Sequence, residues 1–388
     1  NVTDATDVYL EMSGSALFAV FIDDSLSYDY YKLSSNFTDK LYAKIASFSE
    51  AGNHKIRVAK LSQWSASVAI TDILVKGNHP NVFASIPKER KIEIIGDSIS
   101  MGESMFASGS INADVTSEAW LSYAGQTAEY FGADLNLSGM GGSGFTRPAG
   151  GWSSPYTSFD YLEQNSNKWD FSLYVPDLII VNLGTNGGGE NTAQMYIDFY
   201  NQIRNRYEDI SNSIPILFCL GPMSQDAWPA LSAAHAEIIK TDTNVYKAQI
   251  GNKLTAAGHP TVSQHSISAS LLIEEIKHIM PDWDCASLSI GAYQKKGNRI
   301  TVPYRTLNHV ESSSSNMIIG GLFDENGILV TISTQNIAFD KDNFSINQTV
   351  TFNIANLPET AAYNIKLFLW DGKDNIKPLS TSENTSIQ

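Results

Sequence analysis

Ser98 is the first candidate for a chemical role, because it follows an apolar run that ends abruptly. The segment Lys91–Ile95 is typical of a buried strand, and Gly96 can adopt backbone angles that a side chain forbids. A serine at a strand end lies where α/β sheets place their ligands. We therefore take Ser98 as a candidate nucleophile. A capped turn that leads into a helix, without chemistry, is the alternative.

Two later apolar runs end in residues that can donate hydrogen bonds. Asp134–Leu137 leads into the glycine-dense loop 138–144, whose backbone N–H groups can point outward. Leu178–Val181 is followed closely by Asn186, which has a side-chain amide. A flexible linker and a loop-capping asparagine are the alternatives for these two features.

His259 supplies an imidazole on a loop, just before the helical stretch 261–280. Histidine is the usual base for a nucleophilic serine. Among the other histidines, His265 is the runner-up, although a packed or solvated residue is the ordinary role on that helix. The remaining histidines fall in β-rich or helical segments: His54, His79, His235, His278 and His309.

Serine, glycine N–H, asparagine amide and histidine, in this order at loop ends, resemble the four sequence blocks of the SGNH (GDSL-type) hydrolases. The resemblance implies Ser98 as nucleophile and His259 as base. It also implies an oxyanion hole made of the Ser98 N–H, the Gly139 N–H and the Asn186 side chain, with Gly141 as the fallback for Gly139.

The flanking sequence narrows the resemblance to family 2 carbohydrate esterases. It is carried by the segments 90–98 and 218–223 and by a β-rich segment that precedes them, and it covers about residues 1 to 285. That family pairs an N-terminal jelly-roll sandwich with an SGNH domain. It removes acetyl groups from polysaccharides such as xylan and glucomannan.

Two positions depart from the family pattern. The SGNH motif D-x-x-H-P would place aspartate at Ala256, so the usual third member of the triad is missing. Disabling that acid in a serine protease lowers turnover about 10⁴-fold. Some family 2 esterases work with a Ser-His dyad in which a backbone carbonyl holds the imidazole, and we expect such a dyad here. The second departure is Gly187, where the motif G-T-N-D has aspartate.

Aromatic residues in loops after strand ends are candidates for stacking on sugar rings. Trp228 follows the turn at Gly221 and is our first choice for substrate contact, before Trp152 and Tyr156. Each of these residues has packing as its alternative role.

Composition is consistent with a secreted enzyme that acts on neutral substrates. The chain has 388 residues, 43% of them hydrophobic, and a formal net charge of −15, which argues against a nucleic-acid partner. No apolar run reaches the ~20 residues of a membrane span, and the start at Asn1 has the character of a mature or trimmed end. Metal-site spacings are absent, and we expect no cofactor.

The expected organisation has three blocks. Residues 1–88 read as an all-β sandwich, with strands over 17–22, 54–61 and 66–75, and the family resemblance implies that this sandwich is a jelly roll. Residues 89–286 alternate strands and helices, which predicts an α/β SGNH-type parallel sheet with helices on both faces. Residues 290–388 are again β-rich and predict an immunoglobulin-like β-sandwich, which acts as a spacer or binds glycan.

Taken together, the sequence predicts a serine-dependent O-acetyl esterase acting on an acetylated polysaccharide or oligosaccharide. A lipase or small-ester carboxylesterase using the same residues is one alternative. A carbohydrate-binding protein whose hydrolase domain is inactive is the other.

Overall fold

The computed structural model describes most of the chain. The described residues are 1–14, 17–23, 25–32, 41–60, 68–82, 88, 90–106, 117–139, 141–145, 169–207, 213–251, 258–283, 286–291, 293–307, 316–339, 345–355, 363–371, 379–380 and 382–387. Contacts within the chain separate two units: residues 61–65 and 88–283 form one, and residues 1–60, 66–87 and 284–388 form the other. The limits of the three domains predicted from the sequence stay predictions.

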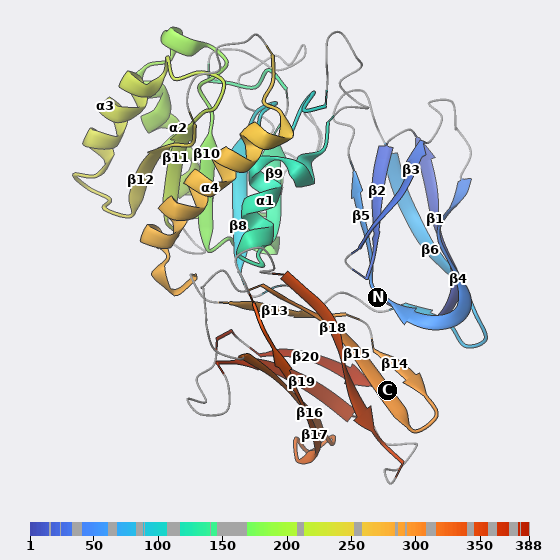
Figure 1. Cartoon of the computed structure of the whole chain (residues 1–388). Coiled ribbons are helices and arrows are strands. Elements are labelled where there is room, and N and C mark those ends of the chain that lie inside the picture. Colours follow the sequence, from blue (N-terminus) through green and yellow to red (C-terminus); the bar gives the residue numbers. More distant parts are fainter. Residues whose placement is uncertain are drawn as a thin grey trace. The chain divides into compact units, whose positions relative to one another are not determined.

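A five-stranded parallel sheet forms the centre of the unit that contains residues 88–283 (Figure 1). The strand order is β12-β11-β10-β8-β9, so the order reverses between β8 and β10. In such sheets, ligands bind outside the carboxyl ends of the strands at the point of reversal. The strands are β8 (Lys91–Gly96), β9 (Asp134–Gly139), β10 (Leu178–Asn182), β11 (Ile216–Leu220) and β12 (Val245–Gln249).

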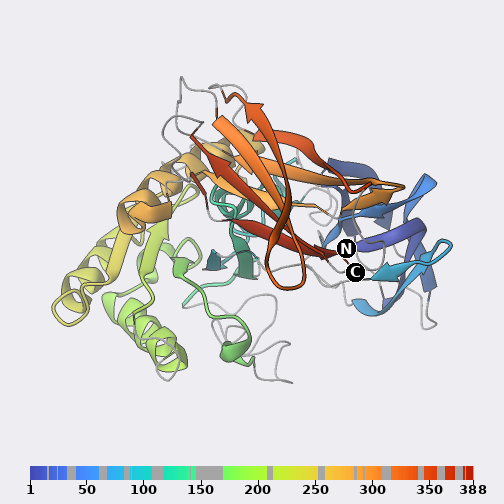
Figure 2. The ribbon, with the colours of Figure 1, turned by 90° about the horizontal axis from the view of Figure 1, so that it is seen from below.

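Helices cover both faces of this sheet, as the sequence predicts (Figures 1 and 2). On one face Ile94 and Ile180 pack under α1 and α4, and on the other Ile95 and Val181 pack under α2 and α3. Neighbouring residues of one strand thus enter opposite cores, which is the period-two pattern of a strand buried on both sides. The helices are α1 (Tyr123–Tyr130), α2 (Ala193–Tyr207), α3 (Trp228–Ile238) and α4 (Val262–Ile279), with short 3₁₀ turns η2 (Ala119–Leu121), η4 (Phe171–Leu173), η5 (Gly188–Glu190) and η6 (Pro281–Trp283).

The N-terminal part of the other unit consists of antiparallel strands around an apolar core that includes Val8, Leu10, Val20 and Ile45. One sheet has the order β4-β1-β6, with β7 paired to β1, and the second has the order β3-β2-β5. The strands are β1 (Val2–Gly14), β2 (Leu17–Ile22), β3 (Ser25–Lys32), β4 (Leu41–His54), β5 (Ile56–Lys60), β6 (Val68–Lys76) and β7 (Asn81–Val82).

The C-terminal part has a second antiparallel core, which includes Ile300, Ile318, Val350 and Leu367. The sheets have the orders β13-β15-β14, with β18 paired to β15, and β17-β16-β19-β20. The strands are β13 (Ser287–Ile290), β14 (Gln294–Lys296), β15 (Arg299–Leu307), β16 (Asn316–Phe323), β17 (Leu329–Ile337), β18 (Ser345–Asn353), β19 (Tyr363–Trp370) and β20 (Glu383–Ile387).

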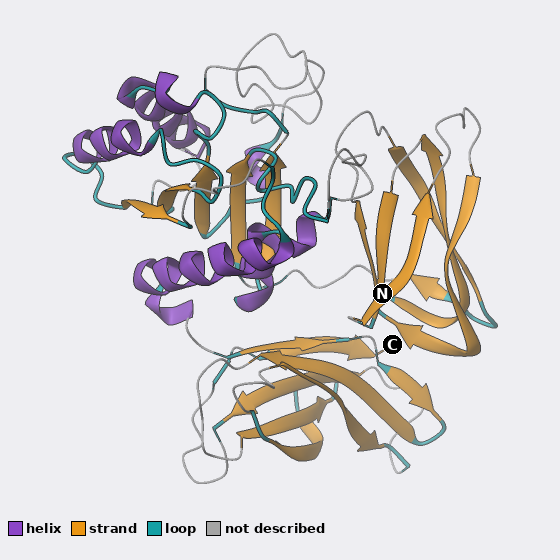
Figure 3. Ribbon diagram, turned by 45° about the horizontal axis from the view of Figure 1, so that its top comes forward, coloured by secondary structure: helices purple, strands orange, loops and turns teal. Residues whose placement is uncertain are grey.

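Helices are confined to one unit in the described part of the chain (Figure 3). An α/β core together with β-rich segments is therefore confirmed. None of the helices in the described ranges is long and apolar enough to cross a membrane.

Candidate active site

The nucleophile candidate lies in a tight turn directly after β8. A Cβ atom on Gly96 would overlap Ser100 Oγ, so only glycine allows the chain to fold back at this point. The turn is closed by hydrogen bonds from Met101 N to Asp97 O (3.2 Å) and from Glu103 N to Ser98 O (3.0 Å). Ser98 itself is 5% exposed. The sequence therefore predicts both the strand end and the turn correctly.

Three neighbouring strand ends bring the predicted oxyanion donors to one edge of the sheet. In the register of the parallel strands, Gly96 lies beside Gly139 of β9 on one side and beside Asn182 of β10 on the other. Ser98 follows Gly96 by two residues, and Asn186 follows Asn182 by four. We call this end of the strands the carboxyl edge.

Asn186 is held by the loops that follow β8 and β9. Its Nδ2 donates to Asp97 Oδ2 (3.2 Å) and to the carbonyl oxygen of Ser143 (2.8 Å). Gly144 allows this approach, because a Cβ atom there would lie 2.8 Å from Asn186 O. Gly187 has φ +93°, a left-handed conformation that favours glycine over the aspartate of the family motif. The second sequence departure thus fits the shape of the Asn186 loop.

Asp97 is a site residue to which the sequence analysis assigned no role. It is fully buried, and its Oδ1 accepts a hydrogen bond from Ile99 N (2.9 Å) while Oδ2 accepts the one from Asn186. Burial raises the pKa of Asp97 to about 7. The sequence signal for this role was the position of Asp97 next to Ser98, because a carboxylate there can accept hydrogen bonds both from the backbone of the turn and from the Asn186 amide.

His259 stands where the predicted loop enters α4. Gly258 has φ +134°, His259 is half-buried, and Thr261 caps α4 in a capping box with Gln264. Residues 252–257, with Ala256 among them, lie outside the described residues. His259 makes no hydrogen bond to any residue in the described ranges, so its pairing with Ser98 and its carbonyl partner stay predictions.

His265, the runner-up for the base, is fully buried. Its Nδ1 accepts a hydrogen bond from Tyr123 N (3.2 Å). Burial, with a smaller contribution from His259, lowers the pKa of His265 to about 4. A ring that is enclosed in this way has no access to a substrate, and His259 therefore remains the candidate base.

Trp228 begins α3 and is half-buried. It packs against the core beneath α2 and α3, and the Lys247 ammonium lies 4.5 Å from the centre of its ring. These contacts describe a packing residue, and a sugar contact by Trp228 stays a prediction. Trp152 and Tyr156 lie outside the described residues. Within the described part of the chain, no group of His, Cys, Asp and Glu side chains has the arrangement of a metal site.

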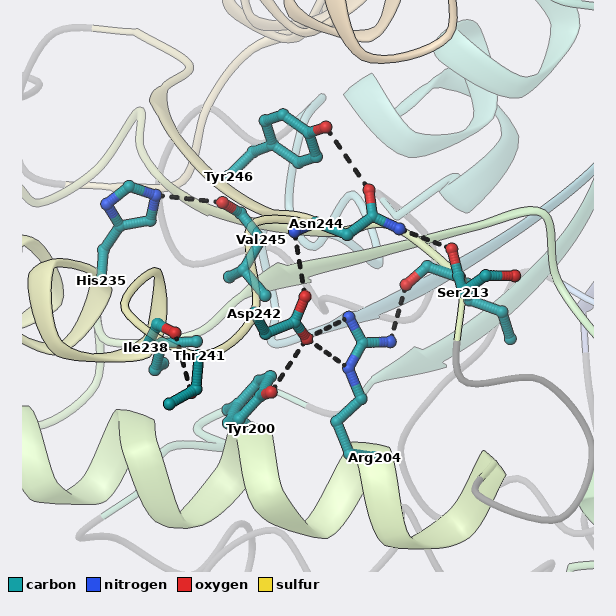
Figure 4. Close-up of polar contacts among 11 residues, drawn as sticks. Tyr200, Arg204, Ser213, His235, Ile238, Thr241, Asp242, Asn244, Val245 and Tyr246 are labelled. Atoms are coloured by element: carbon teal, nitrogen blue, oxygen red, sulfur yellow. Dashed lines mark hydrogen bonds and ion pairs between the residues drawn. The ribbon is translucent and has the colours of Figure 1, made fainter.

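A second polar network lies at the opposite, amino edge of the same sheet (Figure 4). Asp242 accepts hydrogen bonds from Tyr200 OH (2.9 Å) and Arg204 Nε (2.9 Å), and Arg204 Nη2 lies 2.8 Å from the same carboxylate oxygen. Asn244 links the start of β12 to the carbonyl of Ser213 before β11. The network joins α2 to these two strand starts, so its role is structural.

Comparison with known proteins finds esterases that are similar to this chain. No model of a known protein family matches the chain. The chain is 29% identical over 214 residues to a cellulase/esterase CelE from Acetivibrio thermocellus, which covers 50% of this chain and 26% of that protein. It is 26% identical over 253 residues to an acetylxylan esterase / glucomannan deacetylase from Cellvibrio japonicus, covering 61% of this chain and 70% of that protein. The chain thus spans about a quarter of the length of the first relative.

Solved structures of family two carbohydrate esterases share the fold. The enzyme from Clostridium thermocellum, in complex with cellohexaose, aligns with a TM-score of 0.62 and 23% identity over 73% of this chain and 91% of its own. The enzyme from Cellvibrio japonicus aligns with a TM-score of 0.63 and 23% identity over 73% of this chain and 88% of its own. The resemblance predicted from the sequence is confirmed: the chain is similar in sequence to proteins named as esterases, and it shares the fold of family two carbohydrate esterases.

Proposed function

We propose that the protein is a serine-dependent O-acetyl esterase that removes acetyl groups from a polysaccharide of the xylan or glucomannan type. The observation that carries the proposal is the register of β8, β9 and β10. It brings Ser98, Gly139 and Asn186 to the carboxyl edge, where the strand order reverses. Ester cleavage requires a nucleophile and N–H donors at one site, and this register places a hydroxyl and donors from the ends of two neighbouring strands at the same edge of the sheet.

In the proposed reaction, Ser98 Oγ attacks the acetyl carbonyl carbon while His259 takes the hydroxyl proton. The N–H groups of Ser98 and Gly139 and the amide of Asn186 bind the oxygen on which negative charge develops. Collapse of this intermediate breaks the bond between the acetyl carbon and the sugar oxygen, and the sugar oxygen leaves with the proton held by His259. Water then gives a proton to the same imidazole as it attacks the acetyl-enzyme, and acetate is released as Ser98 Oγ receives that proton.

The two hydrogen bonds of the Asn186 amide bear on which of its hydrogens binds the oxyanion in the proposed reaction. Both Nδ2 hydrogens are engaged, and the bond to Asp97 (3.2 Å) is longer than the bond to Ser143 (2.8 Å). We take the hydrogen directed at Asp97 as the one that the oxyanion shares. Catalytic hydrogen bonds often tighten only in the transition-state complex.

His259 acts in this proposal without a carboxylate at position 256. A backbone carbonyl would hold its second ring nitrogen and so fix the tautomer, which makes Ser98 and His259 a dyad. On the C-terminal side of His259, Pro260 and the capped start of α4 restrain the backbone of its loop.

The substrate class rests on the printed names of the relatives, which include an acetylxylan esterase / glucomannan deacetylase. The formal net charge of −15 favours a neutral glycan over an acidic one. A polysaccharide substrate also favours a secreted location. The jelly-roll topology of residues 1–88 and the immunoglobulin-like topology of residues 290–388 remain predictions.

Acetate release from acetylated xylan and acetylated glucomannan tests the proposal. Ser98→Ala should reduce release to the background, because it removes the attacking oxygen. Ser270→Ala should leave release unchanged, because the Ser270 hydroxyl is exposed and, among the described residues, donates to Ser266 O of its own helix alone. Equal release by the wild type and Ser98→Ala would refute the esterase assignment. A preference for longer acyl esters would indicate a lipase, and glycan binding without release would indicate a binding protein.

A further inference from the structure

A buried polar chain, separate from the groups proposed to react, connects the nucleophile turn to the helix that follows His259. It starts at Ser100, two residues after Ser98. The Ser100 carbonyl accepts a hydrogen bond from Ser122 Oγ (2.8 Å), and the Ser100 and Tyr123 hydroxyls lie 2.6 Å apart. Asn182 Nδ2 also donates to the Tyr123 hydroxyl (3.1 Å). The start of α1 thus holds the turn by both the backbone and the side chain of Ser100.

The same end of α1 is bonded to α4, which packs beside it on one face of the sheet (Figure 1). Tyr123 is the first residue of α1, so its N–H has no partner inside the helix. That N–H donates to His265 Nδ1 (3.2 Å), across 142 residues of sequence. His265 N in turn donates to the carbonyl oxygen of Thr261 (2.9 Å), the cap of α4. Only Pro260 separates Thr261 from His259.

If His265 only filled space in the core, its buried polar ring would be energetically unfavourable at this position. Because Nδ1 accepts a hydrogen bond, the neutral ring carries its proton on Nε2. That atom is buried and has no hydrogen-bond partner within the described residues. A buried unpaired donor is unfavourable, so Nε2 gives no reason for a histidine at this position; what the ring supplies is Nδ1, the acceptor for the Tyr123 N–H, which a leucine would leave unpaired. The lowered pKa of His265, about 4, keeps the ring neutral and Nδ1 able to accept at neutral pH.

We propose that the hydrogen bond between Tyr123 N and His265 Nδ1 is a positioning contact, which sets the distance between the Ser98 turn and the His259 loop. His265 is in this view a positioning residue that touches neither substrate nor the reacting atoms. The inference rests on the proposed function, since it assumes that Ser98 and His259 act together.

Three substitutions at position 265 separate positioning from packing. His265→Asn places its amide oxygen where Nδ1 lies and keeps the acceptor. His265→Gln moves the acceptor one bond outward, and His265→Leu removes it. We expect kcat for acetyl ester hydrolysis to fall by up to about 10²-fold in the Leu and Gln variants, with KM little changed, because a small displacement of reacting groups has effects of this size. The Asn variant should retain most of the wild-type kcat.

Matched controls distinguish this effect from general loss of stability. His235 on α3 also makes one hydrogen bond to backbone, from its Nε2 to the carbonyl of Val245 (3.1 Å), and His235→Leu should leave kcat unchanged. Thermal unfolding of every variant shows whether it is folded. If His265→Leu does not fold, comparing kcat between the His265→Asn and His265→Gln variants provides the same test.

The outcomes separate this inference from the proposed function. If Ser98→Ala and His259→Ala abolish hydrolysis but folded His265→Leu and His265→Gln keep the wild-type kcat, the positioning role is refuted and the esterase stands. Equal losses in the Asn, Gln and Leu variants would also refute it, because the acceptor would then not matter. If Ser98→Ala and His259→Ala keep activity, the proposed function itself fails.

Discussion

The two edges of the parallel sheet treat a carboxyl group in opposite ways. At the amino edge, burial would raise the pKa of Asp242, but hydrogen bonds from Asn244 N and Tyr200 and the Arg204 guanidinium outweigh it and lower that pKa. At the carboxyl edge, the hydrogen bonds to Asp97 come from the neutral donors Ile99 N and Asn186, and burial raises its pKa to about 7. The amino edge contains an ion pair, whereas the carboxyl group at the carboxyl edge has no ion pair with any residue that the structure describes.

This difference indicates where the sheet serves stability and where it serves chemistry. At the amino edge, both carboxylate oxygens of Asp242 accept hydrogen bonds, from Tyr200 and Arg204 of α2 and from Asn244 N before β12. The carboxyl edge instead holds an amide whose longer bond can be exchanged and a turn that only glycine permits. We expect substitutions at the carboxyl edge to change rates more than stability, and substitutions at the amino edge to do the reverse.

The largest effect should come from Asn186→Ala at the carboxyl edge. Removing one oxyanion donor typically lowers kcat about 10²–10³-fold. Steady-state hydrolysis of an acetyl ester measures this loss. Asn244→Ala is the matched change at the amino edge, and it should lower the free energy of unfolding by about 1 kcal/mol with kcat unchanged. A normal kcat in Asn186→Ala would contradict the role given to this amide.

Arg204→Met should act only on stability. It leaves Asp242 without its cation, and because these side chains are 14% and 20% exposed, we expect the free energy of unfolding to fall by about 2 kcal/mol. The pKa of Asp242 is lowered from 3.8, so the stabilisation is full above that pH and is lost as the pH falls below it. Chemical denaturation at pH 7 and at pH 3 measures the difference, with exposed Arg206→Met as control. A drop in kcat would show that the two edges are not independent.

The smallest effect concerns Glu93 in the middle of β8. Like Asp97 at the carboxyl edge, Glu93 is a buried carboxyl group whose hydrogen bonds come from neutral donors. Its carboxylate accepts hydrogen bonds from Tyr207 OH (2.8 Å) and Asn136 Nδ2 (3.2 Å), and burial raises its pKa from 4.5 to about 7. Below pH 4.5 the group is protonated both folded and unfolded. Above that pH the unfolded chain gains by ionising, so stability is lost as the pH rises through 7.

Glu93→Gln removes the ionisation. Its amide oxygen still accepts from Asn136 Nδ2, and its NH₂ group donates to the Tyr207 hydroxyl, so that this second hydrogen bond is kept with its direction reversed. We expect it to raise the free energy of unfolding by about 1–2 kcal/mol at pH 8.5 and to have little effect at pH 4.5. Thermal unfolding as a function of pH measures this. The same stabilisation at both pH values would show that ionisation of Glu93 is not its source.

The elements that carry the site were predictable because each has a local signal. The apolar run before Gly96 marks β8, and the three-and-four spacing of Tyr196, Phe199, Ile203 and Tyr207 marks the buried side of α2. The sequence Asp-Glu-Asn-Gly at residues 324–327 likewise marks a turn, and Gly327 has φ +77° there. In contrast, β1 and β4 were not predicted, because several register shifts in their pairing break the alternation of buried and exposed residues.

The contacts that tune the site could not be predicted, because they depend on which strands become neighbours. Tyr123 fits the apolar stripe of α1, and nothing near it in sequence points to His265. Glu93 stands inside a run that reads as a buried strand, and its partners come from β9 and α2. Such pairings follow from the order of the sheet, which single apolar runs do not encode.

Labelling with a fluorophosphonate that mimics the tetrahedral intermediate tests the central claim most directly. Intact-mass and peptide analysis should find one adduct, on Ser98, and His259→Ala should slow its formation by about 10²-fold or more, the contribution of a positioned general base. An adduct on another residue, or labelling of His259→Ala at the wild-type rate, would contradict the account.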